Sequence, residues 1–354
     1  MVTTSPLHAV TSAATLADDA GWRLPAHFGD PAAEYDAARS AAALFDRSSR
    51  GKLTAAGTEA VVFLHNLSTN DVKGLAPGHG CETFFCTATA KAVAHGTLWR
   101  EPPDGKRERL WLDLPAGQAE KLLQHLDRYL ISEDVTLTDH TGALAQMHLA
   151  GPDAGRTLAA AGLDVGAWQR DTFRTVGDWT VRMTDPLGMP GYDLLGPAAD
   201  APALWQRLVA AGARPAGMEA WEMLRVEAGT PEFGKDIFDT TFAPEVGRTA
   251  TAISYQKGCY LGQEPIVMAR DRGMVQRGMV GLLLGADPLP PGTLLVHAGK
   301  EVGRTLSSVR SPRLGQAVAL ATVRRAQTTA GTELEADVAG VRRPVRVAAL
   351  PLVS

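Results

Sequence analysis

Residues 257–264 bring a cysteine, a lysine and two glycines together in one short stretch, which reads Lys257-Gly258-Cys259-Tyr260-Leu261-Gly262-Gln263-Glu264. Glycine adopts backbone angles that other residues avoid, so we expect a shaped loop. Pro265 follows, and proline is favoured at the first position of a helix. A thiol near a helix N-terminus and a lysine has a lowered pKa and is more readily the nucleophilic thiolate. Cys259 and Lys257 are therefore candidate catalytic residues, although a lone cysteine is more often a small buried side chain.

The other two cysteines, Cys81 and Cys86, have a spacing that also occurs in iron–sulfur ligation. Such a site needs four thiolates, and the chain has only three cysteines. Positions five apart on a strand point to opposite faces, so we interpret both residues as part of the core. The histidines show no metal-ligand spacing, and we expect no metal site.

Length and composition indicate an ordinary globular protein. The 354 residues suit two or three domains, and 45% are hydrophobic while 21% are charged. No apolar run approaches the length of a membrane span. The N-terminus lacks a basic region and carries Asp18 and Asp19, which argues against a signal peptide. With so few cysteines, we expect a cytoplasmic protein.

Charge is distributed unevenly along the chain. Residues 270–354 hold 12 Lys/Arg and 6 Asp/Glu, a net charge of +6, whereas residues 1–269 hold 23 and 33, a net charge of −10. A basic C-terminal part attracts RNA, a polyglutamate tail or an acidic protein surface. Because these basic residues form no dense run, we favour a solvated β-rich surface and expect no direct binding of nucleic acid.

An internal repeat indicates two similar lobes. The segments 53–64 and 147–158 share a glycine, an acid, an alanine and a leucine at the same offset of 94 residues, since 147 − 53 = 94. Each segment is typical of a strand, a glycine turn and a helix start. In the first, Thr58 is a plausible N-cap. The helix would bury one face at the 3.6-residue period, formed by Ala60, Phe63, Leu64 and Leu67.

Further along, helical stripes alternate with short strands. A stripe is expected along Leu122, Leu123, Leu126, Tyr129 and Leu130, with two more helices from about residue 200 and over about 217–228. After residue 274 the chain changes to short β-rich runs separated by Gly, Pro and Ser, which predicts a small barrel or sandwich. The fold class is therefore α+β, with one region over residues 1–274 and a β domain over residues 275–354.

Several segments resemble a known superfamily. Residues 257–264 are similar to the K-G-C-Y-x-G-Q-E motif of YgfZ-type folate-binding proteins, which are relatives of the glycine-cleavage T-protein. Residues 224–236, LRVEAGTPEFGKD, resemble the L-R-x-E-x-G-x-P-x-[FY]-G-x-D element of that superfamily. Residues 64–78 and 188–195 resemble two further segments, in the right order and at fitting distances.

The resemblance implies a fold and a cofactor. Members form a three-domain cloverleaf, with two related α+β lobes and a C-terminal β-barrel around a channel that holds tetrahydrofolate or a derivative. It also implies that Asp193, Tyr192, Arg225 and Gln263 bind the cofactor. A carboxylate at Asp193 suits the two adjacent N–H donors of a pterin edge, although a solvated strand-end acid is the alternative. Arg225 is either a clamp on folate or part of an internal ion pair.

Two functions from the superfamily compete. The T-protein aspartate that assists aminomethyl transfer aligns with His95, and this departure disfavours the aminomethyltransferase. The first expectation is therefore a YgfZ-type folate-binding protein that helps iron–sulfur enzymes or assembly factors and so supports tRNA thio-modification, with Cys259 as its functional thiol. The alternatives are a tetrahydrofolate-dependent aminomethyl- or methyltransferase and a non-catalytic scaffold without folate. His95 itself is interpreted either as a surface histidine of a strand or as a catalytic residue.

Overall fold

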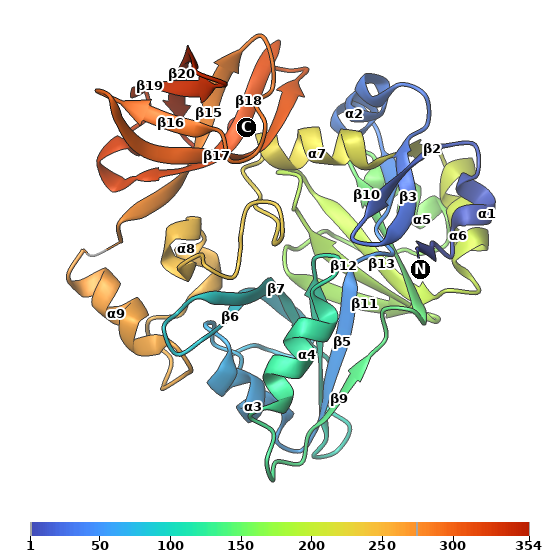
Figure 1. The fold of residues 1–354 in the computed structure, drawn as a ribbon. Helices are drawn as coiled ribbons and strands as arrows, with labels where there is room; N and C mark the ends of the chain where they lie inside the picture. The colour runs from blue at the N-terminus through green and yellow to red at the C-terminus, as the bar shows by residue number, and fades with distance from the viewer. Residues whose placement is uncertain (1, 274, 354) are drawn as a thin grey trace.

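One mixed β-sheet organises most of the N-terminal part of the chain. The computed structural model describes residues 2–273 and 275–353, and within them this sheet has eleven strands. The strands are β4 (Ala43–Asp46), β5 (Gly51–Gly57), β6 (His79–Cys86), β7 (Ala92–Arg100), β8 (Glu108–Leu114), β9 (Thr136–Asp139), β10 (Leu144–Ala150), β11 (Thr172–Val176), β12 (Trp179–Thr184), β13 (Gly191–Pro197) and β14 (Arg214–Ala216). Their spatial order is β14-β4-β10-β13-β12-β11-β6-β7-β8-β5-β9. The sheet is continuous across two lobes (Figure 1).

The two lobes repeat one pattern of elements. Four helices complete them: α3 (Ala60–Leu67), α4 (Ala119–Asp127), α5 (Ala154–Ala160) and α6 (Ala201–Ala210). The first lobe runs β5-α3-β6-β7-β8-α4-β9, and the second runs β10-α5-β11-β12-β13-α6-β14. The segments 53–64 and 147–158 cover β5–α3 and β10–α5, so the predicted repeat of α+β lobes is confirmed. The lobes differ at one edge, where β4 lies between β10 and β14.

Apolar faces pack these helices onto the sheet. Ala60, Phe63, Leu64 and Leu67 of α3 are all buried, as their spacing predicts. The expected cap is wrong, because Glu59 occupies the N-cap position and Thr58 instead donates its hydroxyl to Asp134 at 2.7 Å. The stripe on α4 is shorter than expected. This helix ends at Asp127, and the Tyr129 side chain beyond it is 39% exposed.

The N-terminal residues and a later helix cover the second lobe. A three-stranded sheet has the order β1-β3-β2, and its neighbours include α7. These elements are β1 (Thr3–Thr4), α1 (His8–Thr11), β2 (Thr15–Asp19), β3 (Trp22–His27), α2 (Pro31–Ser40) and α7 (Met218–Glu227). Asp30 caps α2 by accepting from the backbone N–H groups of Ala32 and Ala33.

The C-terminal residues form a closed barrel of six described strands. They are β15 (Arg277–Gly285), β16 (Leu294–His297), β17 (Lys300–Ser311), β18 (Gln316–Arg324), β19 (Glu333–Val338) and β20 (Val341–Ala348), with the short 3-10 helix η2 (Arg325–Gln327) after β18. The barrel closes through pairing of β15 with β20. Its interior is filled by small and branched apolar side chains such as Leu282, Leu295 and Ala319. The expected α+β class with a C-terminal barrel is confirmed.

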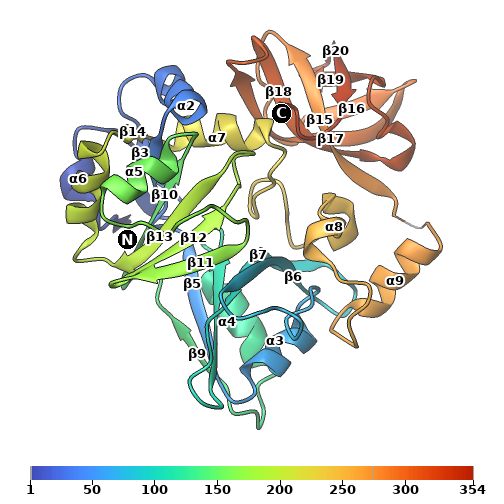
Figure 2. The same ribbon diagram turned by 180° about the vertical axis from the view of Figure 1, so that it is seen from behind.

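An irregular segment joins the lobes to the barrel. It contains η1 (Ala243–Val246), α8 (Thr249–Ala252) and α9 (Gln263–Asp271), and it passes along the first lobe (Figures 1 and 2). The end of the chain returns to α7, where the backbone carbonyl of Glu227 accepts from the backbone N–H of Leu352 at 2.7 Å. The Glu227 carboxylate accepts from the Tyr35 hydroxyl, also at 2.7 Å. None of the helices in the described ranges is long and apolar enough to cross a membrane.

Candidate functional site

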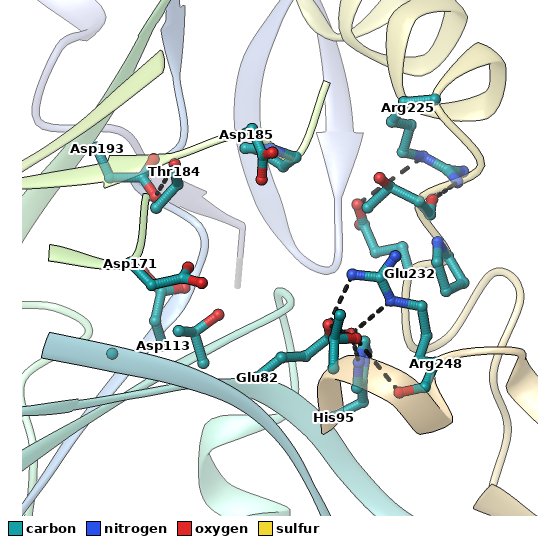
Figure 3. A pocket seen from close by; sticks show the side chains of 18 of the residues that line it. Glu82, His95, Asp113, Asp171, Thr184, Asp185, Asp193, Arg225, Glu232 and Arg248 are labelled. Atoms are coloured by element: carbon teal, nitrogen blue, oxygen red, sulfur yellow. Dashed lines mark hydrogen bonds and ion pairs between the residues drawn. The ribbon is translucent and has the colours of Figure 1, made fainter. Parts of the chain in front are cut away.

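A cavity of about 610 Å³ lies where the two lobes, the joining segment and the end of the chain meet (Figure 3). The first lobe contributes strands β6, β7 and β8, and the second contributes the ends of β12 and β13. Alternate residues of a strand share a face, and His95, Thr97 and Trp99 of β7 line the cavity in this way. Pro351 and Val353 from the end of the chain also line it. The site is thus assembled from parts of the chain that are distant in sequence.

Asp193 on β13 lines the cavity, as expected from the sequence. Its Oδ1 lies 2.8 Å from Nδ1 of His148, and its Oδ2 lies 3.4 Å from the Thr184 hydroxyl. Burial disfavours ionisation of this carboxyl group, but the hydrogen bond from His148 and the positive charge of Arg50 and Arg182 outweigh it and lower the pKa of Asp193 below its ordinary value. Asp193 is therefore an anionic acceptor at the cavity wall.

A second buried carboxylate, Asp113 on β8, holds the lobes together beside the cavity. It accepts hydrogen bonds from Nε of Arg50 at 2.5 Å, from the Gln146 amide at 2.8 Å and from Arg182 at 3.0 Å. Arg50 and Asp113 are in the first lobe, whereas Gln146 and Arg182 are in the second. Sequence reasoning missed this group. Its one signal was an acid inside the otherwise largely apolar strand around Leu110, Leu112 and Leu114.

Glu82 on β6 is a third carboxylate at the cavity, with hydrogen-bond partners of its own. Its carboxylate lies 2.6 Å from Nε2 of His95 and accepts from Arg248 at 2.8 and 2.6 Å and from the Thr251 hydroxyl at 2.6 Å. Burial alone raises the pKa of Glu82, but His95 and Arg248 reverse the effect and hold the pKa far below its ordinary value. Glu82 was also missed from the sequence.

His95 is buried in this cluster and is not a surface histidine. Its side chain is 9% exposed, and its ring stacks on Phe84 with 4.5 Å between centroids and 27° between planes. Phe84 and the Glu82 carboxylate together fix the imidazole at the cavity wall. The position that the alignment gave to an isolated histidine therefore holds a histidine–carboxylate pair.

Arg225 on α7 borders the cavity, but its guanidinium is committed to internal partners. Its donors reach the carboxylates of Glu222 and Asp236, the Ser307 hydroxyl and the Thr230 carbonyl, at 2.5 to 3.2 Å. These bonds engage Nε and both terminal nitrogens of a side chain that is 1% exposed. Of the two sequence interpretations, the internal ion pair is the one that these contacts form. Ser307 belongs to β17, so the pairing connects α7 to the barrel.

Tyr192 points away from the cavity. It neighbours Asp193 on β13, and adjacent strand residues face opposite sides of the sheet. Its side chain packs in the core of the second lobe with Leu149 and Leu158, and burial raises the pKa of its hydroxyl. Tyr192 does not line the cavity as the structure describes it.

Lys257 of the glycine-framed loop is buried against the first lobe. Its ammonium group donates to the backbone carbonyls of His65, Ser68 and Asn70, which lie in and just after the last turn of α3. These carbonyls have no acceptor role inside the helix, so a lysine there caps the helix C-terminus. Burial lowers the pKa of Lys257 to about 7.

Cys259 and Gln263 follow on the outer side of the same loop. Cys259 is exposed, and Gln263 is the first residue of α9, so this helix begins two residues before Pro265. Neither side chain belongs to the described lining of the cavity. A catalytic role for Cys259 and cofactor binding by Gln263 remain predictions from the sequence.

The other cysteines lie on β6. Cys86 is fully buried, and Cys81 is partly buried at the cavity wall. Burial raises the pKa of each thiol to about 12. Across the described ranges, no group of three His, Cys, Asp or Glu side chains is placed to hold a metal ion.

Comparison with known proteins identifies the class to which this fold and cavity belong. Residues 7–257 match the GCVT N-terminal domain, and residues 277–354 match the glycine cleavage T-protein C-terminal barrel domain. The chain belongs to the glycine cleavage T-protein family. This membership agrees with the expected tetrahydrofolate cofactor and with the expected T-protein fold.

Individual relatives cover nearly the whole chain. The aminomethyltransferase of Rubrobacter xylanophilus is 32% identical over 88% of this chain and 83% of its own length. The aminomethyltransferase of Geobacillus kaustophilus is 30% identical over 94% of this chain and 92% of its own length. The crystal structure of glycine cleavage system aminomethyltransferase T from Bartonella henselae superposes with a TM-score of 0.92 at 25% identity, over 100% of this chain and 98% of that one.

These relatives overturn the first functional expectation. The sequence motif around Cys259 favoured a YgfZ-type protein that assists iron–sulfur assembly and tRNA thio-modification. Proteins similar over most of the chain are instead named aminomethyltransferase, and none of these comparisons supports iron–sulfur partners. The motif misled because Lys257 caps the end of α3 and Gly262 is the N-cap residue of α9, so both have local structural roles.

Proposed function

We propose that this chain is a tetrahydrofolate-dependent aminomethyltransferase, or a methyltransferase of the same type. The observation that carries the proposal is the anionic Asp193 carboxylate at the wall of a cavity shared by both lobes. A volume of about 610 Å³ suits a small-molecule cofactor. The names of the full-length relatives support the transfer reaction.

The residues of the cavity fit a reduced folate. Asp193 offers carboxylate oxygens to adjacent N–H donors of a pterin ring. Trp221 also lies at this wall, and its indole N–H is buried without a hydrogen-bond partner within the described residues. Trp99 adds a large aromatic side chain from the first lobe. Tetrahydrofolate, when bound, supplies the nitrogen that accepts the one-carbon unit.

Glu82 and His95 remove the objection that the sequence raised against transfer. The expected carboxylate is absent at position 95, but Glu82 places one 2.6 Å from the His95 ring. A histidine paired with a carboxylate takes or gives a proton while the pair limits the change in charge. We assign this pair the handling of the proton that amine release requires. Arg248 and Thr251 hold the carboxylate in place.

Two measurements on the purified chain test the proposal. Calorimetric titration should show that tetrahydrofolate binds, and Asp193→Ala should weaken binding at least about tenfold through loss of charge-assisted hydrogen bonds. Combined with the other glycine-cleavage components, the chain should form methylenetetrahydrofolate. Asp153→Ala is the matched control, because the ion-pair partner of Asp153 among the described residues is the exposed Arg156.

Absence of binding at high micromolar tetrahydrofolate would reject the proposal and favour the non-catalytic scaffold. Binding without turnover of any aminomethyl donor would reject the transferase and leave a folate-binding protein. A drop in folate affinity for the Asp153→Ala control equal to that of Asp193→Ala would show that the effect is not local to the cavity.

A further inference from the structure

A buried histidine stands beside Asp193 and is not used by the proposed function. His148 on β10 is the cross-strand partner of Asp193 on β13. Its Nδ1 lies 2.8 Å from Oδ1 of Asp193. The His148 side chain is 0% exposed, whereas that of Asp193 is 14% exposed. His148 is therefore placed behind the carboxylate, out of reach of a ligand in the cavity.

The surroundings of His148 fix the orientation of its ring. The Trp221 ring meets it edge-on, with 5.1 Å between centroids and 88° between planes. A Cβ atom at Gly191 would lie only 2.6 Å from Nε2 of His148, so glycine leaves just enough room for the ring. Phe45 is the neighbour of His148 on β4. The imidazole thus has one orientation, with Nδ1 toward Asp193.

The other ring nitrogen decides the protonation of His148. Nε2 is buried and has no hydrogen-bond partner within the described residues. A proton on Nδ1 alone gives Asp193 a donor and leaves only an uncharged lone pair in an apolar environment. A second proton on Nε2 would bury a charged N–H group without an acceptor, which is far more costly.

Charged groups around this pair come from three segments of the chain: β13, β12 and the connection between β4 and β5. Asp193 is on β13 and Arg182 is on β12, directly opposite Asp193. Arg50 precedes β5 and adds positive charge near Asp193. Arg47 follows β4 and lies over the Trp221 ring, 4.1 Å from its centroid. The guanidinium groups of Arg50 and Arg182 already act on the Asp193 charge and oppose a further positive charge on the imidazole.

We propose that His148 is a positioning residue whose neutral Nδ1–H group holds the Asp193 carboxylate in one orientation, with its full negative charge presented to the N–H groups of a reduced folate. This inference rests on the proposed function, because it concerns how the same site recognises its cofactor. Apart from His148, the direct hydrogen bond found for this carboxylate among the described residues is the long one from Thr184, at 3.4 Å. Without His148 the carboxylate turns away from the geometry that the ligand needs.

Nuclear magnetic resonance of the chain with ¹⁵N-labelled histidine tests the protonation without any ligand. The His148 signals are assigned by their loss in His148→Asn. We expect the signals of a neutral ring that carries its proton on Nδ1. A doubly protonated ring at pH 7, or a neutral Nε2–H tautomer, would overturn the inference whether or not folate binds.

Two substitutions test the positioning itself. An asparagine amide at position 148 can still donate to Asp193, whereas leucine fills the space without a donor. We expect His148→Leu to weaken tetrahydrofolate binding about tenfold or more, and His148→Asn to stay within about threefold of the wild type. His125→Leu is the matched control, because His125 is another buried histidine with an unpartnered Nε2, on α4.

The outcomes separate this inference from the proposed function. Wild-type affinity in a folded His148→Leu protein, or equal losses for the leucine and asparagine variants, would overturn the positioning role. Failure of the wild type itself to bind tetrahydrofolate would reject the proposed function, and the resonance measurement would still decide the state of His148. Thermal unfolding of each variant verifies that the comparison is made between folded proteins.

Discussion

The two lobes share a backbone but carry different side chains at equivalent positions. Leu53 and Met147 are equivalent residues of the repeat. Leu53 pairs with Leu112 on β8, and Met147 pairs with Leu194 on β13, so β8 and β13 are equivalent strands. In the first lobe the next cross-strand pair is Trp99 and Trp111. In the second lobe the corresponding pair is Arg182 and Asp193. One lobe therefore presents aromatic surface where the other presents charge.

The difference shows how a duplicated fold separates stability from ligand recognition. The guanidinium of Arg182 lies 5.4 Å from the Trp99 ring centroid and 5.8 Å from that of Trp111, at distances of cation–π contacts. The positive charge of Arg182 is balanced by the Asp113 carboxylate of the first lobe. The first lobe thus supplies the environment in which the second lobe keeps an ionised Asp193. Neither lobe could form this site alone.

Removing the Asp113 carboxylate, which has partners in both lobes, should have the largest effect. Asp113→Ala leaves Arg182 buried, 1% exposed, without its ion-pair partner. We expect the free energy of unfolding to fall by about 3–5 kcal/mol, because breaking a buried pair strands the other charge. Denaturant unfolding measures it, and Asp153→Ala, which removes a surface pair, should cost below about 1 kcal/mol. Similar small losses for both variants would show that the lobes do not depend on this contact.

The Glu82 cluster should make the first lobe sensitive to acid. The folded state holds the pKa of Glu82 below its ordinary value of 4.5, so its ionisation stabilises the fold above pH 4.5 and this stabilisation disappears as pH falls toward the folded pKa. Glu82→Gln should therefore lose less stability than the wild type on acidification from pH 5. Unfolding curves recorded from pH 7 downward measure how the free energy of unfolding changes with pH, and the exposed Glu264→Gln variant is the control. Parallel curves for wild type and Glu82→Gln would contradict this assignment.

The aromatic counterpart of Asp193 allows a sharper comparison. Trp111 donates its indole N–H to Glu101 at 2.6 Å. Trp111→Phe should lower the free energy of unfolding by about 1 kcal/mol through loss of this hydrogen bond. Tetrahydrofolate affinity should stay unchanged, in contrast to Asp193→Ala. If calorimetry instead showed weaker folate binding for Trp111→Phe, the ligand site would extend over both equivalent positions.

The smallest effect is expected at the exposed thiol. Cys259→Ser should change the free energy of unfolding by less than about 0.5 kcal/mol, because the side chain is exposed. Folate affinity and transfer rate should match the wild type, since Cys259 lies outside the described cavity lining. A loss of transfer activity with folate binding intact would restore the catalytic role that the sequence motif suggested.

Local patterns predicted the fold better than they predicted the site. The repeat around Leu53 and Met147 and the apolar face of α3 follow from neighbouring residues, and both were read from the sequence. Asp113 and Arg182 are 69 positions apart and meet only when the two lobes join. His148 likewise stands alone between apolar neighbours in its strand. Single polar residues in strands carry no spacing signal, so their partners become visible only in three dimensions.

The cap that Lys257 places on α3 has a consequence for the order in which the chain folds. Lys257 lies 187 to 192 residues beyond the residues whose carbonyls it binds, which are His65, Ser68 and Asn70. During synthesis the first lobe emerges from the ribosome long before residue 257 is made. Its helix end remains exposed to water until then. The first lobe therefore reaches its final form only after the second lobe has been translated.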